Sequence, residues 1–143
     1  MNRVGLLAKS GCVMLLLAAA AVVGCAKDRP PDEMGSVSGT INFKQDVRLS
    51  PTAVAYVRLA DTSDGSIGGK TIVQKELREL TSSPVAFELP FKEKHIDATR
   101  EYALEIRIVD QGKLMLMSRD KNPVITRGNP SNVEVTMVPA RGF

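Results

Sequence analysis

The chain has 143 residues, with 19 basic and 16 acidic side chains and a formal net charge of +3. This length suffices for one domain with a modest core and not for two. The charges are scattered, and the chain has no Trp and only two Tyr. It therefore lacks the clustered basic face with stacking aromatics that nucleic-acid binding requires, and we exclude nucleic acid as a partner.

The first 25 residues have the pattern of a bacterial lipoprotein signal. Arg3 and Lys9 precede an apolar run at 13–23 that is shorter than the roughly 20 residues of a membrane-spanning helix. An ordinary cleaved signal or a short anchor helix is the alternative, but the run ends in a lipobox and a cysteine, Val22-Val23-Gly24-Cys25. The thiol can take up a diacylglyceryl group, and the small glycine gives a peptidase access. We predict that residues 1–24 are a cleaved signal peptide and that acyl chains, palmitate among them, attach Cys25 to a membrane.

Cleavage would leave 119 of the 143 residues, with 17 basic and 16 acidic side chains. The mature chain would then be almost neutral. Cys12 would leave with the signal and Cys25 would become a thioether, so the exported domain would have neither a free thiol nor a disulfide. Thiol nucleophiles, redox motifs and cysteine-ligated zinc are therefore excluded.

Residues 25–35 are predicted to form a flexible tether that begins at the lipidated cysteine. The segment AKDRPPDEMG at 26–35 alternates charges, contains a Pro-Pro pair and has almost no apolar residue, which is typical of linkers. At about 3.1 Å per residue it reaches at most roughly 30 Å. We therefore expect the folded domain to work close to a membrane.

Residues 36–143 are predicted to form one all-β domain, a single antiparallel β-sandwich of about seven or eight short strands of the immunoglobulin or transthyretin type. Short alternating runs are separated by Gly, Pro, Asn and Asp, as in antiparallel strands. The clearest run, EYALEIRIVD at 101–110, places four large side chains on one face: Tyr102, Leu104, Ile106 and Ile108. The two sheets of a sandwich would bury such faces against each other.

For two segments the pattern does not decide between two kinds of secondary structure. Residues 71–80 suit one stripe of a helix as well as a strand, and we favour a strand because hairpin connections between neighbouring strands are short. Residues 91–99 are expected to form a turn or a single helical turn.

No motif supports catalysis, so we predict that the protein is not an enzyme and needs no metal or cofactor. Residues 64–71, DGSIGGKT, end like a phosphate-binding loop but have the wrong glycine spacing, and a flexible connection between strands explains them. His95, the only histidine, lies between Glu93 and Asp97 without the second imidazole or thiolate of a zinc site. No G-x-S-x-G elbow is present to supply a nucleophile.

The run LMLM at 114–117 is apolar on both faces of a strand. One explanation is a central strand whose second face is covered. The other is an exposed groove lined by Met115 or Met117 that accepts an apolar partner segment, because thioethers adapt their shape easily. Arg107, opposite the core face of its strand, is a candidate anchor for a partner carboxylate, or it pairs with a neighbour such as Glu105. The candidate partner-binding residues are therefore Met115, Met117 and Arg107.

The domain resembles the YbaY-like lipoproteins and the YscW-type pilotins, a family of small lipid-anchored β-sandwich domains of the periplasm. The resemblance covers most of residues 36–139 and rests mainly on core and turn residues. Its carriers are Gly39, LSP at 49–51, AYVRLAD at 55–61, Pro84, Phe87, Leu89, Phe91, Ile96, Tyr102, Arg107, Ile108, Gly112, Leu114 and PVIT at 123–126. Such residues support a fold better than a function.

The resemblance implies a lipoprotein on the periplasmic face of the outer membrane, and Ala26 after the lipidated cysteine fits sorting there. In pilotins the domain escorts a secretin, an outer-membrane channel subunit, to its assembly site, whereas YbaY-like members have no settled activity. We expect a non-catalytic binding domain of the YbaY type. The alternatives are a pilotin or chaperone that binds a short tail of a secretin or another outer-membrane component, and an envelope factor that binds glycan or lipid headgroups.

Overall fold

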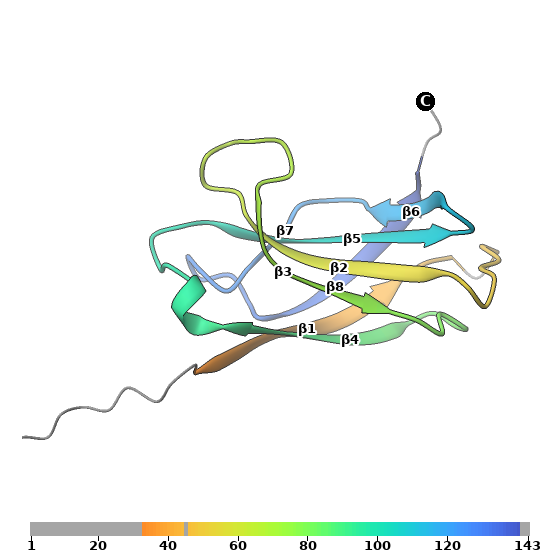
Figure 1. Cartoon of the computed structure of the whole chain (residues 1–143), viewed down its shortest axis with the longest axis horizontal. Coiled ribbons are helices and arrows are strands. Elements are labelled where there is room, and N and C mark those ends of the chain that lie inside the picture. Colours follow the sequence, from red (N-terminus) through yellow and green to blue (C-terminus); the bar gives the residue numbers. More distant parts are fainter. Residues whose placement is uncertain (1–32, 45, 141–143) are drawn as a thin grey trace, which may run out of the picture.

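The computed structural model describes residues 33–44 and 46–140 (Figure 1). The predicted signal peptide, the lipobox Val22-Val23-Gly24 and Cys25 lie outside these residues, as does most of the predicted tether. Eight strands and one short 3-10 helix follow in chain order: β1 (Met34–Asn42), β2 (Val54–Asp61), β3 (Lys70–Leu77), β4 (Val85–Lys92), η1 (Glu93–His95), β5 (Tyr102–Asp110), β6 (Lys113–Ser118), β7 (Asn122–Val124) and β8 (Asn132–Pro139). The all-β prediction is confirmed. Within the described ranges, no helix has the length and apolar character needed to cross a membrane.

The structure decides both segments whose patterns were undecided. Most of residues 71–80 belongs to strand β3, and the connection before β5 contains the single helical turn η1. Strand β1 begins at Met34, two residues before the expected start of the domain. The reason is that Met34 and Gly35 already pair with Lys92 and Phe91 of β4.

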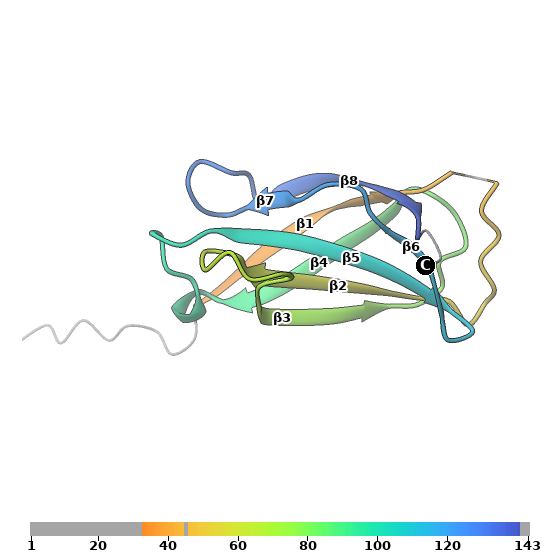
Figure 2. The same cartoon turned by 90° about the horizontal axis from the view of Figure 1, so that it is seen from above.

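The strands form one continuous, nearly closed sheet in place of the predicted two-sheet sandwich (Figures 1 and 2). Their order is β3-β2-β5-β6-β8-β1-β4, with β7 also paired to β5. Strand β8 makes the sheet continuous, because its first residues pair with β1 and its last residues pair with β6. The outermost strands, β3 and β4, then approach each other, and Lys75 Nζ donates a hydrogen bond to the Glu88 carbonyl oxygen at 3.0 Å.

One strand pair departs from the predicted antiparallel arrangement. β1 and β8 run parallel, whereas the other strand pairs are antiparallel. Gly39 permits their close approach, because a Cβ atom there would lie 1.8 Å from the carbonyl oxygen of Val133 on β8. Any larger residue would have to push the two strands apart.

The core fills the interior of the curled sheet. Alternation along β5 buries the four residues that the sequence placed on one face, Tyr102, Leu104, Ile106 and Ile108. Inward residues of β1, β2, β4 and β8 pack against them: Val37, Ile41, Ala55, Val57, Leu59, Phe87, Leu89, Val135 and Met137. Because side chains alternate along a strand, the intervening residues of β2 and β5 project from the outer face of the sheet.

Candidate functional site

The outer face of β2, β5 and β6 carries two rows of side chains that are fixed by strand register. In the first row, Arg107 on β5 lies between Tyr56 on β2 and Met117 on β6. Paired residues point to the same face of a sheet, so the guanidinium is flanked by a phenol ring and a thioether. The neighbouring row is aliphatic and consists of Val54, Val109 and Leu114.

A β-bulge in β6 separates the two methionines of the apolar run. The pairing with β5 shifts by one residue between Leu116 and Leu114, so Met115 has no residue opposite it. The extra residue lets Met115 pack against the core beside buried Leu116, while Met117 and Leu114 are each 43% exposed. The run is therefore not a strand covered on both faces, and of its two methionines only Met117 is exposed. Its outward residues are Leu114 and Met117.

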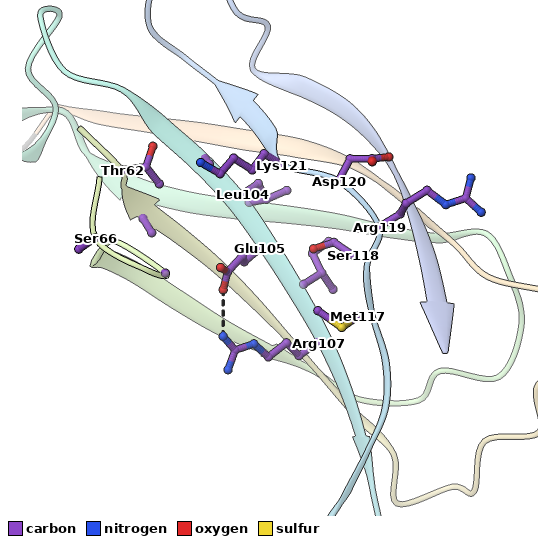
Figure 3. Close-up of a pocket in the computed structure, with 14 residues that line it drawn as sticks. Thr62, Ser66, Leu104, Glu105, Arg107, Met117, Ser118, Arg119, Asp120 and Lys121 are labelled. Atoms are coloured by element: carbon purple, nitrogen blue, oxygen red, sulfur yellow. Dashed lines mark hydrogen bonds and ion pairs between the residues drawn. The ribbon is translucent and has the colours of Figure 1, made fainter. Parts of the chain in front are cut away.

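A groove of about 240 Å³ lies beside this face (Figure 3). Residues 103–107 of β5 form its floor, part of the β2–β3 connection forms one wall, and residues 117–121 form the other. The second wall exists because the pairing of β6 with β5 ends at Met117, and the chain pairs with β5 again only at Asn122. We call this hollow the Arg107 groove.

Glu105 in the floor of the Arg107 groove binds two arginines through one oxygen. Its Oε2 lies 2.6 Å from Arg58 Nη2 and 3.1 Å from Arg107 Nη2. Arg58 also donates to the carbonyl oxygen of Gly68 at 2.6 Å and to Thr71 Oγ1 at 3.1 Å. Arg58, whose side chain is mostly buried, therefore neutralises Glu105 and fastens the β2–β3 connection to the sheet.

Arg107 keeps most of its hydrogen-bonding capacity. A guanidinium has five N–H donors, and the one acceptor that Arg107 contacts among the described residues is Glu105. Its side chain is 56% exposed. Arg107 is therefore held in position by one hydrogen bond to Glu105, the contact drawn in Figure 3, and its remaining donors have no partner among the described residues.

The β2–β3 connection holds Ile67 at the rim of the groove. Gly69 has a φ of 60°, and a Cβ atom there would lie 2.2 Å from the Asp61 carbonyl oxygen, so the turn requires glycine. Asp64 accepts hydrogen bonds from the hydroxyl of Ser66 at 2.7 Å and from its backbone N–H at 3.0 Å, which lower the pKa of Asp64. These local bonds shape a turn from which Ile67 stands fully exposed next to Ser66, which lines the groove.

One exposed apolar side chain lines this groove, and two more stand on the segments beside it. In the part of the chain that the structure describes, four large apolar side chains are exposed. Met117 lines the wall of the groove, Ile67 directly follows the lining residue Ser66, and Leu114 lies in the next row of the sheet, opposite Val109. Met34 lies apart, at the start of β1. Clustered apolar side chains beside an exposed arginine are typical of a surface that binds another protein.

The structure brings together two of the three predicted partner-binding residues. Arg107 and Met117 are cross-strand neighbours that line one groove, whereas Met115 packs toward the core. Sequence reasoning missed Ile67 and Leu114. A large aliphatic residue among glycines was the signal for Ile67, but the exposure of Leu114 depends on the bulge, which alternation does not reveal.

The histidine site considered from the sequence has no counterpart in the structure. His95 lies exposed in η1, and among residues 33–44 and 46–140 no three His, Cys, Asp or Glu side chains gather as metal ligands. The glycine-rich connection leads into strand β3 in place of the helix that a phosphate-binding loop requires.

The fold is thus a small all-β domain, one curled sheet with a groove beside Arg107 on its outer face. Residues 32–137 match the family model described as the type III secretion system lipoprotein chaperone, YscW. The chain therefore belongs to the YscW family, and the predicted resemblance is confirmed.

Two individual proteins place the chain among its relatives. It is 32% identical over 117 residues to the Escherichia coli K12 protein named "Uncharacterized lipoprotein YbaY". The match covers 81% of this chain and 61% of that relative, so the chain spans less than two thirds of its length. The fold is also similar to an alternative pilotin from the type II secretion system of Vibrio cholerae, with a TM-score of 0.71 and 23% identity over 77% of this chain and 100% of that one. At this identity the likeness bears on the fold alone.

Proposed function

We propose that the protein is a lipid-anchored envelope lipoprotein whose domain binds a partner protein without catalysis, as a pilotin-like chaperone. Membership of a lipoprotein-chaperone family supports this function. The observation that carries the binding role is the exposed Met117 beside the partly unsatisfied Arg107 in one groove, with Ile67 and Leu114 exposed on the neighbouring segments.

The proposed partner is a secretin subunit or a similar outer-membrane component. The family description names a secretion-system chaperone, and the solved relative is named a pilotin. The acyl chains on Cys25 would hold the domain on the periplasmic face of the outer membrane, because two or more chains make membrane attachment stable. Residues 26–33 would then join the anchor to β1, which begins at Met34.

Secretin assembly in cells tests this function. In a strain that lacks the chromosomal gene, we expect the Cys25→Ser variant and the Leu114→Ser, Met117→Ser double variant to leave a secretin mislocalised or monomeric. The first variant loses the anchor, and the second loses exposed apolar contacts while its core is retained. The measurement is the amount of heat-resistant secretin multimer in purified outer membranes.

Matched substitutions serve as controls for this experiment. Cys12→Ser changes a thiol inside the predicted signal peptide, and Met34→Ser changes an exposed methionine that lies outside the groove. Both should restore wild-type multimer. Normal assembly and location of every secretin of the cell in the double variant, at equal protein level, would contradict the proposed binding site.

A further inference from the structure

We infer, on the basis of the proposed function, that the segment received by the Arg107 groove is acidic as well as apolar. One carboxylate of the segment pairs with Arg107, and an adjoining apolar side chain contacts Met117 and Ile67. This assignment names the chemistry of the partner segment from the side chains that the groove presents.

The position of Arg107 favours a carboxylate. Its Nη2 is held 3.1 Å from Glu105 Oε2, and the same oxygen lies 2.6 Å from the largely buried Arg58. The stronger contact of Glu105 is therefore with Arg58, and Arg107 is oriented without being neutralised. The planar fork of a guanidinium matches the two oxygens of a carboxylate and binds them with two parallel hydrogen bonds.

Most of the remaining charges of the groove have the same sign as Arg107. The wall at 117–121 carries Arg119 and Lys121, with Asp120 as the one acidic residue between them. All three side chains are exposed, and none has a hydrogen bond or ion pair with the rest of the described chain. With Glu105 paired to Arg58, the basic residues outnumber the acidic ones, and charge complementarity calls for an acidic partner.

The size of the groove and its apolar rim favour a peptide segment. Its volume of about 240 Å³ is below the roughly 300–1,000 Å³ of pockets that enclose whole small ligands. It therefore suits one or two side chains of a longer segment. Met117 lines one wall, and the fully exposed Ile67 lies between Ser66 and Gly68 of the other wall, so both are available for apolar contacts with a residue next to the carboxylate.

A peptide-binding experiment tests the inference. Twelve-residue fluorescent peptides that tile the periplasmic and carboxyl-terminal regions of the secretins of the same cell are titrated with the full-length lipoprotein in zwitterionic detergent. Each acidic peptide that binds is compared with a copy in which Asp and Glu are replaced by Asn and Gln. We expect the amide copy to bind at least about tenfold more weakly to the wild type.

The Arg107→Gln variant identifies the residue responsible for this discrimination. It should bind the acidic peptide about tenfold more weakly and should no longer distinguish it from its amide copy. Arg78→Gln is the matched control, since Arg78 is an exposed arginine that pairs with one glutamate, Glu76, outside the groove. It should bind both peptides as the wild type does.

The outcomes separate the inference from the proposed function. Equal binding of acidic and amide peptides, or equal discrimination by Arg107→Gln and the wild type, would overturn the inference and leave secretin binding intact. Failure of every peptide and of the intact secretins to bind would overturn both. Displacement of the acidic peptide by micelles doped with phosphatidylglycerol, and not by zwitterionic micelles, would assign Arg107 to a lipid headgroup and would also overturn the inference.

Discussion

Asp110, at the end of β5, joins two loops through one carboxylate. Its Oδ1 and Oδ2 accept hydrogen bonds from the hydroxyl of Ser50 at 2.5 Å and from the Ser50 backbone N–H at 2.8 Å. The same hydroxyl contacts Thr52 Oγ1 at 2.7 Å. The Ser50 hydroxyl, followed by its backbone N–H, lowers the pKa of Asp110 below the ordinary value of 3.8. The carboxylate thus fastens the chain before β2 to the turn between β5 and β6.

Asp110→Asn should destabilise the fold in a pH-dependent manner. The folded-state pKa lies below the unfolded-state pKa, so the carboxylate contributes its full stabilisation above about pH 4 and loses it as the pH falls through the folded-state pKa. We expect a lower urea midpoint than the wild type at pH 7 and a smaller difference below pH 4. Asp46 is an exposed carboxylate between β1 and β2, and Asp46→Asn should leave the urea midpoint unchanged at both pH values. A difference that is constant with pH would contradict this role of Asp110.

Individual residues also show what could be predicted from the sequence. Alternation placed Arg107 opposite the core face and named Glu105 as its neighbour, and both features are present. It could not show that Glu105 binds Arg58 as well, because Arg58 and Glu105 lie 47 positions apart and meet only through the pairing of β2 with β5. Arg107 is left without full neutralisation because Glu105 also pairs with Arg58, which lies far away in the sequence.

At the scale of elements, the type and approximate position of the strands were predictable, and their pairing was not. Alternation is a local property, so it identified the strand β5 and its buried face. It holds no information on which strands far apart in the chain become neighbours. Alternation therefore could not reveal the parallel pairing of β1 with β8 or the bulge in β6. These features distinguish the observed curled sheet from the expected sandwich.

The edge of β4 shows how the sheet can end without full closure. Pro90 has no N–H to offer, and the Glu88 carbonyl oxygen already accepts a hydrogen bond from Lys75 of β3. Proline and lysine at an edge discourage the addition of a further strand. The partner segment is therefore expected at the Arg107 groove and not at the edge of β4.

Gly39→Ala tests the junction between β1 and β8. An added Cβ atom would lie 1.8 Å from the Val133 carbonyl oxygen, so we expect a loss of about 2–3 kcal/mol in the free energy of unfolding. Gly65→Ala is the control, because a Cβ atom there meets nothing within 4 Å. It should cost about 1 kcal/mol for its positive φ alone. Urea unfolding measures both, and a Gly39→Ala cost no larger than that of Gly65→Ala would contradict the close strand approach.

At the scale of the whole molecule, the start of β1 and the Arg107 groove occupy different parts of the fold. β1 and β4 lie on the opposite side of the core from β5 and β6 (Figure 1). The chain enters the domain at Met34, the first residue of β1. A tether of at most roughly 30 Å would therefore keep the proposed domain near the membrane while leaving the Arg107 groove open to a partner. The proposed anchoring and binding roles are compatible in one small domain.

The most direct test is site-specific photocrosslinking in living cells. A photoreactive residue replaces Ile67 or Met117 at the Arg107 groove, or Ala86, an exposed residue of β4 on the other side of the core. The account predicts adducts with a secretin, identified by mass spectrometry, from positions 67 and 117 and none from position 86. Secretin adducts from position 86 alone, equal yields from all three positions, or no secretin adduct from the groove would contradict it.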